Sequence, residues 1–114
     1  MSNKIHPFLS DFPLKRTAHL SECKRVFLKG IDENSSINEF AFDSFKSKEV
    51  CEEKEHSTIT EYLYFITGRG KCQVDEEGIE ILPNTFLRGP AVSKHNFINT
   101  GIENLEFILF DISI

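Results

Sequence analysis

Short apolar stretches separated by polar turns predict a chain built from β-strands. In residues 61–67 apolar side chains occupy both faces of the expected strand, and in residues 37–45 Phe40 and Phe42 share one face. Further strands are expected at residues 25–28, 52–57, 71–74, 79–82, 86–88, 95–99 and 105–112. No segment shows the 3.6-residue period of an amphipathic helix, so the pattern predicts an all-β protein.

The segments between these strands carry turn residues. Glycine, proline or asparagine occurs at residues 68–70, 76–78, 83–84, 89–90 and 100–101, where the chain must reverse. Many short strands at even spacing are typical of an antiparallel sandwich or barrel. Residues 1–20 contain two prolines and mixed polarity, and we expect an irregular arm there with a short strand or helical turn. Residues 21–114 then form a single domain.

The composition fits a small cytoplasmic protein with one core. The chain has 114 residues, and its 11 phenylalanines supply the bulk of that core. A net charge of −5 argues against nucleic-acid and anionic-membrane partners, since both need a basic patch. No apolar segment has the length of a transmembrane helix or a signal peptide. Three cysteines without a C-x-x-C motif favour reduced thiols, and we expect Cys72 to lie in the core beside Val74.

A carboxylate begins the most apolar strand. Side chains alternate along a strand, so Glu61 is expected to share a face with Leu63 and Phe65. A carboxylate among such residues is costly unless it is paired, hydrogen-bonded or bound to a metal. On the preceding strand the same alternation places Lys54 and His56 on one face together with Glu52, and puts residues 51, 53 and 55 on the other.

A second histidine, His95, follows a Gly-Pro turn near the other end of the strand series. A hairpin pattern can bring it beside His56 and Glu61. Two imidazoles and one carboxylate form a set of ligands that suits iron(II) and related divalent metals. Two other interpretations stay open: the histidines could line a pocket without metal, and Glu61 could pair with Lys54.

The spacing of these residues resembles that of the cupins, whose motifs are G-x5-H-x-H-x4-E-x6-G and G-x5-P-x-G-x2-H-x3-N. His56, Glu61 and Gly68 match the end of the first motif, and residues 90, 95 and 99 match the second. The likeness covers residues 48–99 in its motifs and most of the chain in its strands. It implies an antiparallel jelly-roll β-barrel. It also implies a metal pocket in the mouth of the barrel, with His56, Glu61 and His95 as ligands.

The sequence departs from the cupin pattern at four positions. Lys48 and Asn84 replace glycines, which we expect to alter turns only, and Val92 replaces a third. Lys54 stands where the family has the first histidine, so three of the four usual ligand positions are retained. An ammonium beside a divalent cation is repulsive, so Lys54 is expected to swing away, to pair with a carboxylate, or to act as a catalytic base if its pKa is lowered.

The leading hypothesis is a small metal-dependent cupin that acts on a small polar metabolite. Iron, manganese, nickel or zinc would bind substrate oxygens or activate dioxygen or water, and Lys54 would bind an anionic or carbonyl group. Whether the protein is an enzyme stays open. One alternative is metal-free binding of a sugar or an acid, and another is a metal-free sugar isomerase or epimerase with a histidine base.

Three further expectations concern surfaces and turns. Because residues 62–66 are apolar on both faces, the outer face needs a cover, and we expect a homodimer. Tyr62 and Tyr64 are then packing or interface residues. Asn99 is expected to cap a turn, and the charged residues 46–55 are expected to form a solvated strand edge.

Overall fold

The computed structural model describes residues 8–16, 23–29, 36–48, 50–55, 59–89 and 94–113. Side chains are described for these residues apart from 15, 16, 23, 51–55, 94 and 95. The predicted positions His56, Pro90 and Val92 therefore lie outside the described residues. No helix in the described part of the chain is long and apolar enough to cross a membrane.

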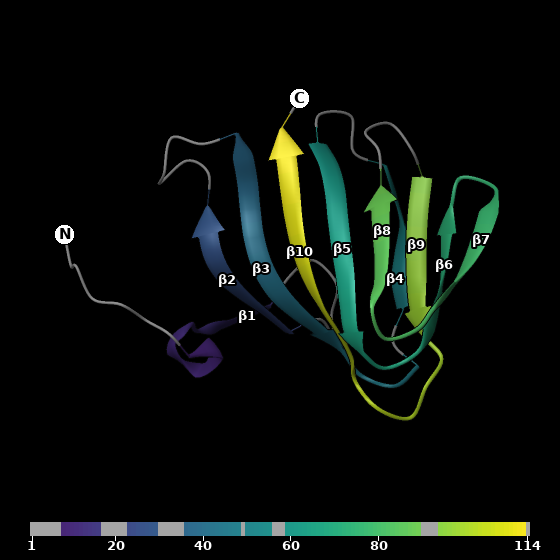
Figure 1. Cartoon of the computed structure of the whole chain (residues 1–114), viewed down its shortest axis with the longest axis horizontal. Coiled ribbons are helices and arrows are strands. Elements are labelled where there is room, and N and C mark those ends of the chain that lie inside the picture. Colours follow the sequence, from purple (N-terminus) through teal and green to yellow (C-terminus); the bar gives the residue numbers. More distant parts are fainter. Residues whose placement is uncertain are drawn as a thin grey trace.

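Strands make up nearly all of the regular structure (Figure 1). The elements in chain order are η1 (Leu9–Asp11), β1 (Leu14–Arg16), β2 (Cys23–Lys29), β3 (Ile37–Phe45), β4 (Val50–Glu55), β5 (Ile59–Thr67), β6 (Gly70–Val74), β7 (Glu77–Ile81), β8 (Thr85–Gly89), β9 (Lys94–Asn99) and β10 (Leu105–Ser113). Each strand predicted from the sequence is present, with ends that shift by at most two residues. The arm contains both a helical turn and a short strand, where the sequence predicted one or the other.

The strands form two antiparallel sheets. A six-stranded sheet has the order β1-β2-β3-β10-β5-β8, and a four-stranded sheet has the order β4-β9-β6-β7. Apart from the β6–β7 hairpin, consecutive strands from β3 to β10 lie in different sheets, in the crossing pattern of a double Greek key. The all-β prediction is confirmed. Within the described residues no hydrogen-bonded strand pair links the two sheets, so the predicted jelly roll is confirmed only as two packed sheets and not as a closed barrel.

The core lies between the sheets because alternate residues of each strand point there. In β10 every second side chain from Leu105 to Asp111 is buried, and the intervening ones are half-buried. Buried apolar residues from both sheets form one cluster: Ala41, Phe45, Leu63, Phe65, Cys72, Ile81, Leu87, Phe97, Leu105, Phe107 and Leu109. Burial of each large side chain contributes roughly 1.5–3 kcal/mol, so these alternating positions hold the sheets together.

Phenylalanine rings join the two sheets at one end of the core. Phe97 of the four-stranded sheet lies 4.9 Å from Phe45 and 5.4 Å from Phe107, measured between ring centroids. Phe65 packs 5.0 Å from Phe107. We call this region, which comprises Phe45, Phe65, Ile81, Phe97, Asn99, Leu105 and Phe107, the packed end. It lies at the bottom of Figure 1, where the connections β5–β6 and β9–β10 run.

The turns at the packed end are tied together through Asn99. Its side chain is fully buried, and its amide donates to the carbonyl oxygens of Phe45 at 3.0 Å and Glu103 at 2.8 Å. Its Oδ1 accepts from the N–H of Gly101 at 2.9 Å. The predicted turn-capping role of Asn99 is confirmed. Nearby, Gly68 has φ of +93°, and a Cβ there would meet a backbone oxygen at 2.6 Å, so the turn requires glycine.

Candidate functional site

A row of acidic residues crosses the inner face of the six-stranded sheet at the end opposite the packed end. Glu39 pairs in register with Asp111, which pairs with Glu61, which pairs with Gly89. Cross-strand partners share a face, and Leu63 and Leu109 on the same strands are buried, so these carboxylates face the space between the sheets. Asp111 is buried and the two glutamates are half-buried.

Glu61 occupies the predicted position. It shares the inner face of β5 with the buried Leu63 and Phe65, as the alternation of the sequence indicated. Its neighbour on β8 is Gly89, a buried residue without a side chain. On the other side lies Asp111, which the sequence analysis did not single out.

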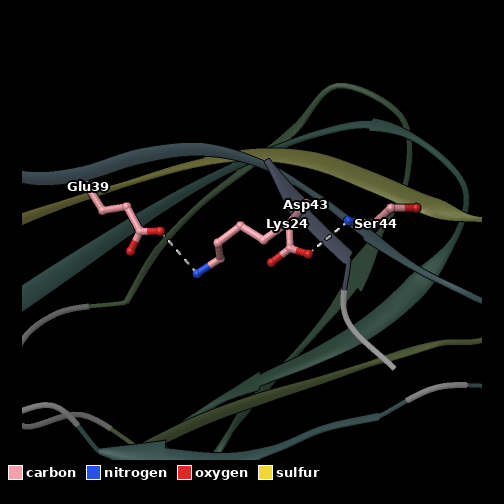
Figure 2. Close-up of polar contacts among 4 residues, drawn as sticks. All are labelled: Lys24, Glu39, Asp43 and Ser44. Carbon is pink, nitrogen blue, oxygen red and sulfur yellow. Dashed lines mark hydrogen bonds and ion pairs between the residues drawn. The ribbon is translucent and has the colours of Figure 1, made fainter. Parts of the chain in front are cut away.

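Lys24 brings a positive charge to this inner face (Figure 2). It lies opposite Asp43 in the β2–β3 register, and its Nζ is 3.4 Å from Oε1 of Glu39, four residues before Asp43 in β3. Both side chains of this ion pair are less than one-fifth exposed. Lys24 therefore extends along the sheet toward the acidic row rather than across to its register partner.

Asp43 is the most buried of these acids. The residue is fully buried, and its Oδ1 accepts from the backbone N–H of Ser44 at 2.9 Å. Its Oδ2 has no hydrogen-bond partner among the residues that the structure describes. We call Lys24, Glu39, Asp43, Glu61 and Asp111 the charged wall. Figure 2 shows how Lys24 turns to Glu39 while Asp43 contacts Ser44.

The four-stranded sheet brings two predicted positions together. Lys54 of β4 is the register partner of His95 of β9, and His95 also pairs with Val74 of β6. Val74 packs against the core, so positions 54 and 95 lie on the inner face of this sheet. Position 95 is at the end of β9 remote from Asn99, which is the end of the molecule where the acidic row lies.

The prediction for β4 was wrong in one respect. Strict alternation placed Cys51 and Lys54 on opposite faces, but Cys51 pairs with the inner residue Phe97 and Lys54 pairs with His95. The register shifts between these two pairs, so three steps on β4 match two on β9. A bulge of this kind changes which residues face inward.

Of the predicted site residues, only Glu61 has a described side chain. Lys54 and His95 are placed by their backbone register, and His56 lies in the β4–β5 connection outside the described residues. Within the described side chains, no group of three or more His, Cys, Asp or Glu residues is arranged to hold a metal ion. The charged wall by itself therefore does not form a metal site.

Alternation along β3 and β10 gives a partial signal for the charged wall. Glu39 and Asp43 alternate with Ala41 and Phe45 along β3, and Asp111 follows three apolar residues at the same spacing in β10. An acidic residue in step with an apolar series indicates an ionisable group that faces the core. Such a signal becomes informative only once the pairing of the strands is known.

Two turn residues support the motif comparison. Lys48 and Asn84, which replace motif glycines, have φ of 68° and 70°. Glycine is the residue best suited to these left-handed conformations, and asparagine tolerates them better than lysine does. The backbone has therefore kept the geometry that the glycines of the motif provide.

The fold is that of a small two-sheet β-domain with a double Greek key, and the charged wall lies on its inner face. The cupin domain family matches residues 42–112, which is more than half of the chain, and the chain belongs to the cupin family. The resemblance inferred from the motifs is thereby confirmed. No curated protein sequence matches the chain.

Solved structures show the same fold at low sequence identity. A predicted oxalate decarboxylase from Thermotoga maritima is 16% identical, with a TM-score of 0.87, over 96% of this chain and 100% of that one. KdgF from a Halomonas species is 11% identical, with a TM-score of 0.76, over 92% and 90%. A cupin superfamily protein from Desulfitobacterium hafniense is 17% identical, with a TM-score of 0.68, over 98% and 93%. At these identities the likeness establishes the fold but does not identify a substrate.

Proposed function

We propose that this cupin binds a small polar metabolite between its sheets, at a divalent metal held by His56, Glu61 and His95. The observation that carries the proposal is the place of Glu61, half-buried on the inner face next to Gly89. Position 95 lies on the inner face of the other sheet, and its register partner there is Lys54 of β4. Two imidazoles and a carboxylate with open positions suit iron, manganese, nickel or zinc.

The metal, when bound, would polarise oxygen atoms of the ligand. Glu61 would supply the negative charge that offsets the metal. Lys54, opposite His95, would bind an anionic or carbonyl group of the ligand and keep its ammonium away from the metal. In this proposal the half-buried setting of Glu61 strengthens each of these electrostatic contacts relative to water.

Metal analysis of the purified chain without a histidine tag tests the proposal. We expect about one divalent ion per chain in the wild type and a loss of roughly tenfold or more in Glu61→Gln and His95→Ala, since each variant removes a ligand. Glu103→Gln, an exposed residue at the packed end, is the matched control and should retain the metal. Equal and negligible metal in the wild type and His95→Ala would end the metal proposal.

A metal-free binding protein is the second candidate. The ion pair of Lys24 with Glu39 favours it, because it shows a lysine neutralising an inward carboxylate on the same wall. Lys54 could act in the same way toward Glu61. A rise in melting temperature with a sugar or small acid that persists in a strong chelator would support this candidate. A sugar isomerase that uses His95 as base would lose its activity in His95→Ala, so retained activity would exclude it.

We propose further that two copies associate through the outer face of the six-stranded sheet. Six aromatic rings form a continuous stripe there, in the order Phe12, Phe27, Phe40, Phe110, Tyr62 and Phe86, with neighbouring centroids 4.8–6.4 Å apart. Phe86 is 56% exposed, and Phe40, Tyr64 and Ile66 are also exposed on this face. A contiguous apolar surface of this kind is typical of an interface.

The molar mass in solution tests the dimer. We expect sedimentation equilibrium to give a dimer for the wild type and a monomer for Phe86→Glu, because a charge within an apolar interface is desolvated without a partner. Ile102→Glu is the control, since Ile102 is an exposed apolar residue at the packed end. A wild-type monomer, or equal dissociation in both variants, would refute this interface.

A further inference from the structure

The outer face of the four-stranded sheet carries a groove that is separate from the charged wall. It has a volume of about 670 Å³ and runs over β9, β6 and β7. The residues that line it include Lys71, Gln73, Gly78, Glu80, Asn96 and Ile98. Cys72 and Ile79 also border it. Because Cys72 and Phe97 lie in the core and Ile79 packs against it, the groove lies on the face turned away from the interior. Its volume is in the range of ligand-binding sites in proteins.

A missing side chain opens the groove toward β7. Asn96, Gln73 and Gly78 are register partners in one row across the sheet. Gly78 has no atom within 4 Å of the point where a Cβ would lie. The row thus presents two amide side chains and then a gap. A side chain that approaches from beyond β7 can pass over Gly78 and reach Gln73.

β7 is the edge of its sheet. Among the described strands it pairs only with β6, through a hairpin whose two-residue turn joins Val74 to Glu77. A two-residue turn is closed by a hydrogen-bonded pair, and such pairs alternate along an antiparallel ladder. Ile79 therefore bonds to β6, while the N–H and C=O groups of Gly78 and Glu80 point to the free edge. An edge of this kind can accept another strand.

The charge near this edge selects the partner. Asp75, Glu76, Glu77 and Glu80 are exposed acids within six residues, and Lys71 is the exposed base of the adjoining strand. If β7 paired with β7 of a second copy, acidic residues would approach acidic residues, which disfavours self-pairing. An extended segment that carries lysine or arginine complements the edge in both charge and main-chain hydrogen bonding.

We propose that the β7 edge and its groove bind an extended basic segment of another protein. The segment adds as a strand next to β7 and exchanges main-chain hydrogen bonds with Gly78 and Glu80. Alternate side chains lie on the groove side, one beside Glu80 and one over Gly78 toward Gln73. This binding is independent of the metal and of any ligand between the sheets.

Peptide binding by the full-length protein tests the charge requirement. The probes are two fluorescent octapeptides, one alternating Lys and Val and one alternating Glu and Val, measured by anisotropy. We expect the basic peptide to bind at least about tenfold more tightly than the acidic one. Glu80→Lys should weaken it by a similar factor, whereas Glu103→Lys, an equal charge change at the packed end, should not. Equal losses of affinity in the two variants would mean that only the net charge of the protein attracts the peptide, which would overturn the proposal. The absence of binding would also overturn it.

Two further measurements test the edge itself. The φ of Gly78 lies outside the left-handed region, so Gly78→Val keeps the strand while it fills the gap, and it should weaken binding. A basic peptide N-methylated at the residues that face β7 should not bind. Amide hydrogen exchange should slow at Gly78 and Glu80 on binding, with little change at Ile79. If these two amides exchange slowly without peptide, and the protection increases with protein concentration, the edge pairs with a second copy and a separate partner is refuted.

Discussion

The packed end and the charged wall solve the problem of buried polar groups in different ways. At the packed end, Asn99 is fully buried and takes part in three hydrogen bonds that tie the turns together. In the charged wall, Asp43 is equally buried, yet one of its oxygens has no described partner. An unsatisfied buried group of this type costs about 1–3 kcal/mol.

The difference indicates where stability and chemistry lie in this fold. The packed end joins the two sheets through ring contacts and through turns whose polar groups are hydrogen-bonded. It therefore offers few free polar groups to a ligand. The charged wall places several carboxylates and one ammonium on an interior face, where their interactions are stronger than in water. Stability supplied at one end allows the other to keep groups that a purely structural core would exclude.

The largest expected effect concerns the rings of the packed end. Phe65→Ala should lower the free energy of unfolding by about 3–5 kcal/mol, because a fully buried ring is replaced by a cavity beside Phe97 and Phe107. Urea unfolding should show a lower midpoint with an unchanged slope. Ile102→Ala, at an exposed position, is the control and should change little. A loss below about 1 kcal/mol in Phe65→Ala would contradict the assignment of stability to the packed end.

Removal of the satisfied polar group should have the next largest effect. Asn99→Ala leaves the carbonyls of Phe45 and Glu103 and the N–H of Gly101 without their partner. We expect a loss of about 2–4 kcal/mol, measured by the same urea titration. Asn104→Ala, at an exposed position in the same loop, should cost less than about 0.5 kcal/mol. Similar losses in both variants would mean that the hydrogen bonds of Asn99 do not hold the turns.

Cys72 provides a pH-dependent test of the apolar core. Burial raises the pKa of its thiol from 9.0 to about 11. Above pH 9 the unfolded chain loses this proton while the folded chain retains it, so stability falls as the pH rises from about 9 to 11. The loss should amount to roughly 2 kcal/mol and should be absent from Cys72→Val. The measured quantity is the wild-type minus variant unfolding free energy at pH 8 to 11. A difference that stays constant with pH would show that the thiol is not buried in the native state.

The strands could be predicted because their information is local. Apolar runs and turn residues located the ends of each strand to within two residues. The bulge in β4 could not be predicted in this way. Residues 52–55 are all charged, so they have no apolar period to define a face, and the register comes from pairing with β9.

The candidate site was predictable in part for a similar reason. Glu61 was found because it begins an apolar strand and fits a spaced motif. Asp43, Asp111 and Lys24 match no motif, and their role depends on β2, β3, β10 and β5 lying side by side in a given register. Such long-range pairing is a property of the folded sheet. Alternation within β3 and β10 gives the inward acids, but only the fold brings them to one wall.

The smallest expected effect concerns the ion pair of the charged wall. Lys24→Met and Glu39→Gln each break a contact of 3.4 Å between partly buried groups. The double variant should be more stable than the sum of the single losses predicts, with a coupling of about 0.5–1 kcal/mol, because the second change no longer leaves a charge unpaired. Urea unfolding of the four proteins gives the coupling, and it should fall in high salt less than for a surface pair. A coupling of zero would mean that Lys24 pairs with Asp43 or with a ligand rather than with Glu39. The charged wall would then be a binding surface rather than a region that stabilises the fold, in contrast to the packed end.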